Sequence, residues 1–159
     1  MYELCRYKDR VLRALMQDPN NPKIMSIIID GMDQSHCRVP YRGTQDSFSK
    51  PLTQHITAIK EHGHGVTIYR TLETVAKGAD LTIYCILSQL ESWKQRNGQY
   101  PEEIFLQCDG GSENANQYLL GMLEILVAKR MAKKILFTRL PTGHTHEDIG
   151  KFQLLSIIG

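Results

Sequence analysis

The sequence predicts one α/β domain built around a mixed five-stranded sheet. Short, strongly apolar segments rich in β-branched residues alternate with longer amphipathic segments, which is typical of buried strands covered by helices. Three strand-like segments come early in the chain, and strands then alternate with helices. The chain has 159 residues, of which 42% are hydrophobic and 23% charged. This is enough for a single well-buried core.

Composition and charge exclude several classes of protein. No run reaches the ~18 consecutive apolar residues of a membrane span. The charged first segment, MYELCRYKDR, is unlike a secretory signal. We therefore expect an intracellular protein with no membrane association. A formal net charge of +2 is too small to identify a nucleic-acid partner by itself. Neither GxGxxG nor GxxxxGK[ST] occurs, so these routes to nucleotide binding have no support.

The chain has four cysteines and no CxxC pair among them: Cys5, Cys37, Cys85 and Cys108. Cys85 and Cys108 lie within apolar segments, where a free thiol usually acts as a small buried side chain. We expect reduced cysteines, as in an intracellular protein. A structural zinc site with ligands from residues 36–37 and 62–64 is the alternative, although neither segment has zinc-finger spacing.

The start of the chain is predicted to form a helix and a buried strand. Residues 2–16 are amphipathic, and the prolines within residues 18–22 end this helix. Residues 24–29 (IMSIII) are typical of a strand buried on both faces, and Asp30 follows directly. The predicted apolar face of the helix consists of Leu4, Val11, Leu12 and Leu15, and its remaining surface carries Arg6, Lys8, Arg10 and Arg13.

A β-hairpin is predicted after a loop at residues 34–52. Its strands are residues 53–60 and 65–72. The connection at residues 61–65 contains two glycines, which suit the positive φ angles of a tight turn. The second strand alternates in polarity like a half-buried antiparallel strand.

A helix and a further strand are expected next. Asp80 is predicted to cap a helix that ends near Asn97, with Gly98 as its C-terminal stop. Residues 103–108 (EIFLQC) form an apolar strand, and Asp109 follows it directly. The predicted apolar stripe of the helix consists of Ile83, Ile86, Leu87, Leu90 and Trp93.

The last part of the chain is predicted to form a helix, a strand and the start of another helix. The first helix begins at Ser112 or Asn114 and extends to about Lys133, and residues 134–139 form the fifth strand. Residues 144–149 (HTHEDI) begin a helix rich in histidine and acidic residues.

The order of these elements predicts the fold. Three consecutive strands with short links favour an antiparallel meander, and two strand–helix units then add parallel strands by crossover. The result is a ribonuclease H-like sheet: three antiparallel strands, then two parallel ones, flanked by helices. We expect residues 1–22 to form an N-terminal helix and linker, and residues 23–159 to form the core.

Acidic residues end the two strands that lie side by side at the centre of such a sheet. Asp30 ends the first strand and Asp109 the fourth, so their carboxylates should meet at one edge. Two such groups repel unless they are protonated or bridged by cations. Mg²⁺ or Mn²⁺ favours oxygen ligands, and two ions support phosphoryl displacement. A third acid is expected from Glu147 or Asp148.

Each of these residues also has a purely structural interpretation. An aspartate at a strand end often forms a turn or caps a helix, and Asp109 precedes two glycines that suit a tight turn. His144 and Asp148 could form a hydrogen bond at a helix start. Asp33 is interpreted as a loop residue. The agreement of three acidic positions with one topology favours a metal site.

Several segments together resemble an uncharacterised eukaryotic, transposon-derived domain family that is similar to DDE-type transposase or integrase catalytic cores. The resemblance covers about residues 7–150, and its two most specific motifs are DGMDQ and GHTHED. The segments are SIIIDGMDQS (26–35), HITAIKEHGHG (55–65), DLTIYCILSQL (80–90), IFLQCDGGSEN (104–114) and LPTGHTHEDIG (140–150).

The resemblance implies a set of catalytic and metal-binding residues. Asp30 is similar to the first catalytic aspartate of the family and Asp109 to the second. The third acid belongs to the GHTHED segment. Relatives commonly have GHTHxDxD, with an aspartate where this chain has Gly150. Asp148 or Glu147 would then have to replace that ligand.

The resemblance also bears on His144 and on the end of the chain. His144 is implied to orient a carboxylate or to contact the scissile phosphate. After Gly150 the family-like pattern fades, and an apolar tail stands where a long closing helix is expected. This indicates a truncated C-terminal helix.

Three functions are compatible with these observations. The first is metal-dependent cleavage and transfer of DNA strands by an intracellular, nuclear protein that could form a homo-oligomer. The second is an inactive transposon remnant that acts as a nucleic-acid-binding or interaction module. The third is a ribonuclease H or exonuclease. Phosphate contacts could come from basic residues at 6–13 and from Lys129, Arg130, Lys133, Lys134 and Arg139.

Overall fold

The computed structural model describes residues 2–31, 38–39, 52–72, 74–75, 78–108 and 117–139. The predicted order of elements is confirmed within these residues. The elements are α1 (Tyr2–Leu15), β1 (Ile24–Gly31), β2 (Arg38–Val39), β3 (Leu52–Glu61), β4 (Gly65–Leu72), α2 (Ala79–Asn97), β5 (Glu103–Cys108), α3 (Gln117–Ala128) and β6 (Lys134–Arg139).

The main strands lie in the order β4-β3-β1-β5-β6. β3 is antiparallel to both β1 and β4, whereas β5 is parallel to both β1 and β6. This mixed sheet confirms the ribonuclease H-like topology. The short β2 is absent from the predicted elements and pairs with the first two residues of β3. Because β2 has two residues, its sequence has no period that would separate it from a loop.

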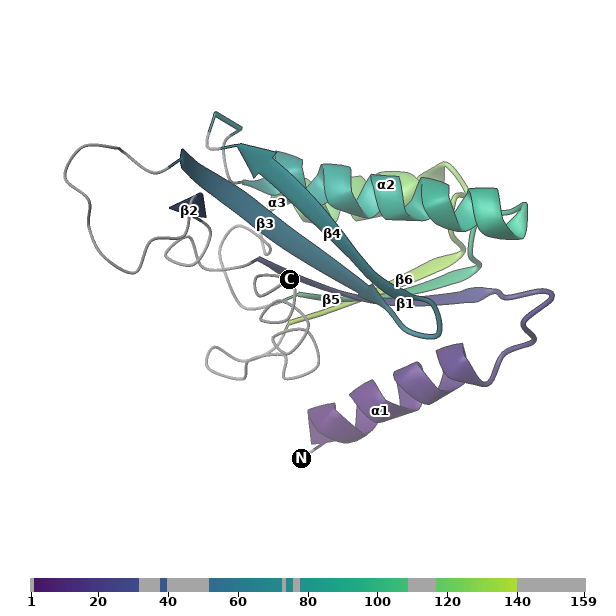
Figure 1. Ribbon diagram of the computed structural model, residues 1–159. Helices are drawn as coiled ribbons and strands as arrows, with labels where there is room; N and C mark the ends of the chain where they lie inside the picture. Colours follow the sequence, from purple (N-terminus) through teal and green to yellow (C-terminus); the bar gives the residue numbers. More distant parts are fainter. Residues whose placement is uncertain are drawn as a thin grey trace.

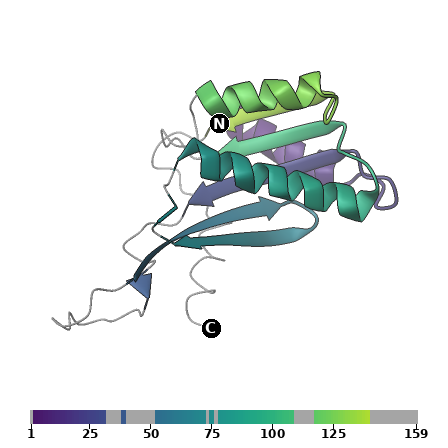
Figure 2. The same cartoon turned by 90° about the horizontal axis from the view of Figure 1, so that it is seen from above.

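Helices cover both faces of the sheet (Figures 1 and 2). α2 and α3 lie on one face, and α1 lies on the other. The alternation of side chains explains how β1 serves both layers. Its residues Met25, Ile27 and Ile29 belong to the large core beneath α2 and α3. Ile28 instead packs with Ala58, Tyr7 and Val66 on the α1 side. β1 is therefore buried on both faces, as predicted.

The predicted apolar face of α1 is wrong in part. Leu12 and Leu15 are 54% and 52% exposed, whereas Ala14 is buried and Tyr7 packs against the sheet. The chain after the helix explains this orientation. The Gln17 amide donates to the Ile24 carbonyl, and its carbonyl oxygen accepts from the Ile24 backbone N–H. The helix therefore presents a mostly polar face to the sheet.

The ends of α2 and α3 differ in detail from the prediction. Asp80 does not cap α2; it lies in the first turn, and Gly78 occupies the N-cap position. A carboxylate in the first turn still stabilises the helix dipole. Gly98 ends the helix in the left-handed conformation, as predicted. α3 ends at Ala128 rather than near Lys133, because the chain turns at Arg130 with a φ of 58°.

Polar side chains of α2 form hydrogen bonds with a buried carboxylate of β3. Glu61 is 3% exposed, and its carboxylate accepts hydrogen bonds from Arg96 at 2.6 and 2.7 Å and from Gln89 at 2.6 Å. Tyr69 of β4 in turn donates to Gln89 at 3.3 Å. This network fixes the position of α2 along the sheet, because a buried charge needs its partners.

None of the helices in the described part of the chain combines the length and the apolar character that a bilayer crossing requires.

Replacing either of two glycines by alanine should change the free energy of unfolding, in opposite directions at the two positions. Gly98 has a φ of +74°, so Gly98→Ala should lower the free energy of unfolding by about 1 kcal/mol through strain. Gly121 lies inside α3 with open space where a Cβ would lie, so Gly121→Ala should raise it by about 0.5–1 kcal/mol. Urea unfolding measures both. Equal effects would contradict the left-handed conformation of Gly98 at the end of α2 and the place of Gly121 inside α3.

Removing the charge of Glu61 should destabilise the fold. Glu61→Gln leaves the half-buried Arg96 without its ion-pair partner, so the free energy of unfolding should fall by about 2–3 kcal/mol. The control is Glu102→Gln, because Glu102 pairs with Lys23 and Lys133 at the surface. We expect almost no change there. If Glu61→Gln leaves the free energy of unfolding unchanged in chemical denaturation, the position of α2 does not depend on this network.

Candidate functional site

The candidate site lies at the edge of the sheet where the parallel strands β1 and β5 end. Their register pairs Ile24 with Glu103 at the start and Ile29 with Cys108 at the end. Asp30 follows Ile29 and is still within β1, where it also pairs with Ala58 of β3. Cys108 is the last described residue of β5. The sequence continues with Asp109, which lies outside the described residues.

Asp30 lies on the face of the sheet that α1 covers. Its partner Ala58 and its neighbour two residues earlier, Ile28, both pack on that side. Residues of β5 alternate in the same way: Leu106 and Cys108 belong to the core under α2 and α3. Gln107 lies on the other side and lines a pocket with α1. Asp30 and Gln107 therefore share the α1 face.

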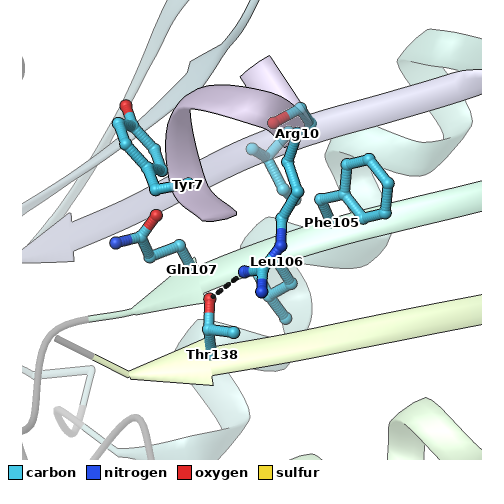
Figure 3. Close-up of a pocket in the computed structure, with 8 residues that line it drawn as sticks. Tyr7, Arg10, Phe105, Leu106, Gln107 and Thr138 are labelled. Atoms are coloured by element: carbon cyan, nitrogen blue, oxygen red, sulfur yellow. Dashed lines mark hydrogen bonds between the residues drawn. The ribbon is translucent and has the colours of Figure 1, made fainter. Parts of the chain in front are cut away.

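A small pocket with polar and apolar lining lies between α1 and the sheet (Figure 3). Its volume is about 10 Å³, room for about one water molecule. Arg10 of α1 reaches across to β6, where its Nη1 donates to the Thr138 hydroxyl at 3.2 Å. Gln107 of β5 also lines the pocket, and its amide points toward the side of Tyr7 (Figure 3). The full lining is Tyr7, Arg10, Ser26, Ile27, Phe105, Leu106, Gln107 and Thr138.

His62 holds α1 close to β1. Its backbone N–H donates to the Ser26 carbonyl at 2.9 Å, and its Nδ1 lies 3.0 Å from the Ser26 hydroxyl. Its Nε2 lies 3.2 Å from the Tyr7 hydroxyl, so both ring nitrogens have protein partners. The alternative of a zinc site at residues 62–64 receives no support. No group of three or more His, Cys, Asp or Glu side chains among the described residues could hold a metal ion.

Two of the cysteines are buried in the core. Cys85 and Cys108 are not part of a disulfide, as predicted. Burial raises the pKa of the Cys85 thiol to about 11, so it stays protonated near neutral pH. A protonated thiol is neither a nucleophile nor a metal ligand. His36 and Cys37, the other suggested zinc ligands, lie outside the described residues.

The remaining predicted site residues lie outside the described part of the chain. These are Asp109, His144, Glu147 and Asp148, together with Gly150. Of the predicted metal ligands, the structure places Asp30 alone. The further residues that sequence reasoning missed are Gln107 and Thr138. A glutamine two positions before Asp109 in an otherwise apolar strand was the available signal.

The predicted basic residues do not gather at one place. Arg10 lines the pocket near the candidate site. Lys134 begins β6, at the opposite edge of the sheet from Arg139. Arg13 and Lys133 form ion pairs with Glu103 and Glu102. Within the described chain, Arg10 is therefore the basic residue that reaches this pocket.

Three solved structures illustrate what the chain is similar to. The Mos1 transposase paired-end complex with left transposon end has a TM-score of 0.49 and 8% identity, over 96% of this chain and 45% of that chain. The pre-cleavage Mos1 transpososome has a TM-score of 0.49 and 7% identity, over 95% and 47%. The simian T-cell lymphotropic virus intasome has a TM-score of 0.46 and 16% identity, over 87% and 39%. The chain thus spans less than half the length of each of these proteins.

The sequence matches the model of one protein family. No curated protein sequence matches the chain. Residues 44–156, well over half of the chain, match the model of a domain of unknown function, DUF7869. The matched range includes most of the sheet, both of the helices that cover its large core, and the GHTHED segment. The chain therefore belongs to the DUF7869 family.

Proposed function

We propose that this chain carries the catalytic core of a transposase- or integrase-like protein that cleaves and joins DNA strands. The observation that carries the proposal is the parallel register of β1 and β5. Ile29 and Cys108 are paired, and the residue that follows each of them in the sequence is an aspartate. Consecutive Cα atoms are about 3.8 Å apart, so Asp109 cannot be far from the end of β5.

The alternation of side chains supports the same proposal. Asp30 lies on the α1 face, and Gln107, two residues before Asp109, lies on it too. If β5 continues for one more residue, Asp109 points to the same face as Asp30. The two carboxylates then form an oxygen-rich site of the kind that Mg²⁺ and Mn²⁺ prefer. Bound divalent ions would stabilise the attacking and leaving oxygens of a phosphoryl displacement.

The chain's own residues have distinct proposed roles. Asp30 and Asp109 hold the cations and so position the scissile phosphate. Asp148 or Glu147 supplies the third carboxylate, and His144 orients a carboxylate or contacts the phosphate. Residues 23–159 form this core, and residues 1–22 supply the helix and linker that precede it. DNA as the substrate implies a nuclear protein, and joining two DNA ends would suit a homo-oligomer.

Gly150 favours a second candidate function. If relatives use an aspartate at this position as the third ligand, this chain lacks it. The domain would then be a catalytically inactive remnant that binds nucleic acid or another protein. The two candidate functions require the same fold. They differ in whether bound divalent ions support DNA cleavage.

Loss of either strand-end carboxylate should abolish DNA cleavage. Asp30→Asn and Asp109→Asn keep the size of the side chain but remove the charge that holds the cation. Nicking of supercoiled plasmid in Mn²⁺ should fall roughly 100-fold or more, as expected from losing several kcal/mol of metal-ion stabilisation. Asp18→Asn is the control, because the Asp18 carboxylate lies in an exposed turn and accepts a hydrogen bond from the Asn20 backbone. Equal nicking by all four proteins would exclude the proposed site. Nicking by none of them would favour the inactive candidate.

Restoring an aspartate at position 150 should reveal which residue is the third ligand. If Gly150 has cost the protein a ligand, Gly150→Asp should tighten binding of the second Mn²⁺ at least about tenfold in calorimetric titration. If Asp148 or Glu147 already fills that role, Gly150→Asp leaves the affinity unchanged and Asp148→Asn weakens it. Metal binding by the Asp30→Asn variant that equals wild type would contradict both outcomes.

A further inference from the structure

The outer surface of α3 is apolar and exposed. Of the 12 residues of this helix, Glu124 is the only charged one. The side that faces away from the sheet carries Tyr118 and Ile125, which are 69% and 59% exposed. A helix that is apolar on all sides is typically buried, so this surface favours a partner. The side that is buried against the sheet consists of Leu119, Leu123 and Leu126.

The exposed apolar residues have the spacing by which two helices pack side by side. Steps of three, four and three residues are those of the a and d positions of a heptad. At 3.6 residues per turn, they form a stripe that lies about 140° around the helix from the buried leucines. Gly121 has open space where a Cβ would lie, so a second helix can approach closely there. This outer stripe of α3 consists of Tyr118, Gly121, Ile125 and Ala128.

Two opposite charges flank the outer stripe of α3, one on each side. Glu124 lies in the helix, and the turn continues to Lys129, whose backbone N–H donates to the Ile125 carbonyl at 2.8 Å. Neither Glu124 nor Lys129 forms an ion pair within the described part of the chain. In a parallel helix pair, an acid at this heptad position faces the residue five places later in the other helix.

The flanking charges therefore determine which orientation of two α3 helices is favourable. In a parallel pair, Glu124 of each copy meets Lys129 of the other, which gives two ion pairs. In an antiparallel pair, equivalent positions face each other, so Glu124 would lie opposite Glu124. The same patch supplies both members of each ion pair, which is the property of an interface with two-fold symmetry.

We propose that the outer stripe of α3 binds a second copy of this chain, with the two α3 helices parallel about a two-fold axis. β5 ends and α3 begins at the same end of the sheet (Figure 2). An axis along α3 therefore directs the sheet edges that carry Asp30 to the same side of the dimer. The use of this arrangement to join two DNA ends rests on the proposed function, whereas the dimer itself does not.

The first test is the oligomeric state of the 159-residue chain, without DNA or divalent metal. Sedimentation velocity over about 1–500 µM protein should show a dimer with a micromolar dissociation constant, as for a small interface. Ile125→Glu places two carboxylates against each other and should raise that constant at least about 100-fold. Because Ile125 is exposed, the variant should keep the fold, which circular dichroism checks.

The matched control is Leu12→Glu, which makes the same change at a residue of α1 that is 54% exposed, on the other face of the sheet. It should leave the dissociation constant unchanged. A wild type that is monomeric over the whole range would overturn the proposal. So would a dimer that Ile125→Glu leaves intact, or one that Leu12→Glu dissociates as strongly.

Reversal of the flanking charges tests the parallel orientation. Glu124→Lys and Lys129→Glu each bring like charges together and should weaken the dimer roughly tenfold at low salt. The double variant restores both ion pairs and should return to nearly the wild-type affinity. An antiparallel pair has like charges opposite each other before and after either single reversal. Single variants with wild-type affinity would therefore contradict the parallel arrangement.

A disulfide gives an independent measure of the orientation. In a parallel pair, Ala128 lies beside Ala128 of the second copy, within the ~7 Å between Cα atoms that a disulfide requires. Oxidised Ala128→Cys should therefore form a covalent dimer. Leu120→Cys is the control, because Leu120 is exposed but lies outside the stripe, and it should not exceed the wild-type background. Equal cross-linking by the two variants, or none by Ala128→Cys, would overturn the parallel arrangement. Failure of the nicking experiments would leave all these outcomes unaffected.

Discussion

The parallel pairing of β1 with β5 is the constraint on which the rest of the molecule depends. Both strands are buried on both faces, with alternate residues packed under α2 and α3 or under α1. A slip of one residue would move each side chain to the wrong layer, so the apolar pattern specifies the register strongly. That register also determines which residues follow the paired strands at the edge. The packing of the core and the geometry of the candidate site therefore have one cause.

The two helical layers are attached to this sheet by polar contacts from neighbouring residues. Glu61 belongs to β3 and binds Arg96 and Gln89 of α2. His62, the next residue, contacts Ser26 and Tyr7 on the α1 side. Consecutive residues serve opposite faces because side chains alternate along a strand. These contacts lie near the β3–β4 turn, away from the edge where β1 ends. The end of the sheet that is fixed by polar networks is thus not the end proposed for catalysis.

The sequence predicts an element correctly where burial imposes a regular apolar pattern. It fails where polar contacts determine how an element is oriented. The run at residues 24–29 is so apolar and β-branched that it predicts a central strand, and the topology follows from the order of elements. The prediction for the face of α1 is wrong because it places the leucines inward. The inward residues instead meet polar partners: Arg10 contacts Thr138, which is distant in sequence, and Gln17 contacts the backbone of Ile24. Such pairings cannot be read from a periodic pattern. The acids at residues 109, 147 and 148 come from topology and resemblance, and they remain predictions.

The polar inner face of α1 is difficult to explain by stability alone. Position 10 lies over Phe105 and Leu106, where a leucine would bury apolar surface without desolvating a charge. Within the described residues, the arginine there donates its hydrogen bond to a neutral hydroxyl, while Leu12 and Leu15 are exposed. Residues that lower stability without a compensating contact are concentrated at functional sites. The same helix that closes one face of the sheet thereby brings a positive charge next to the edge where the acidic residues follow.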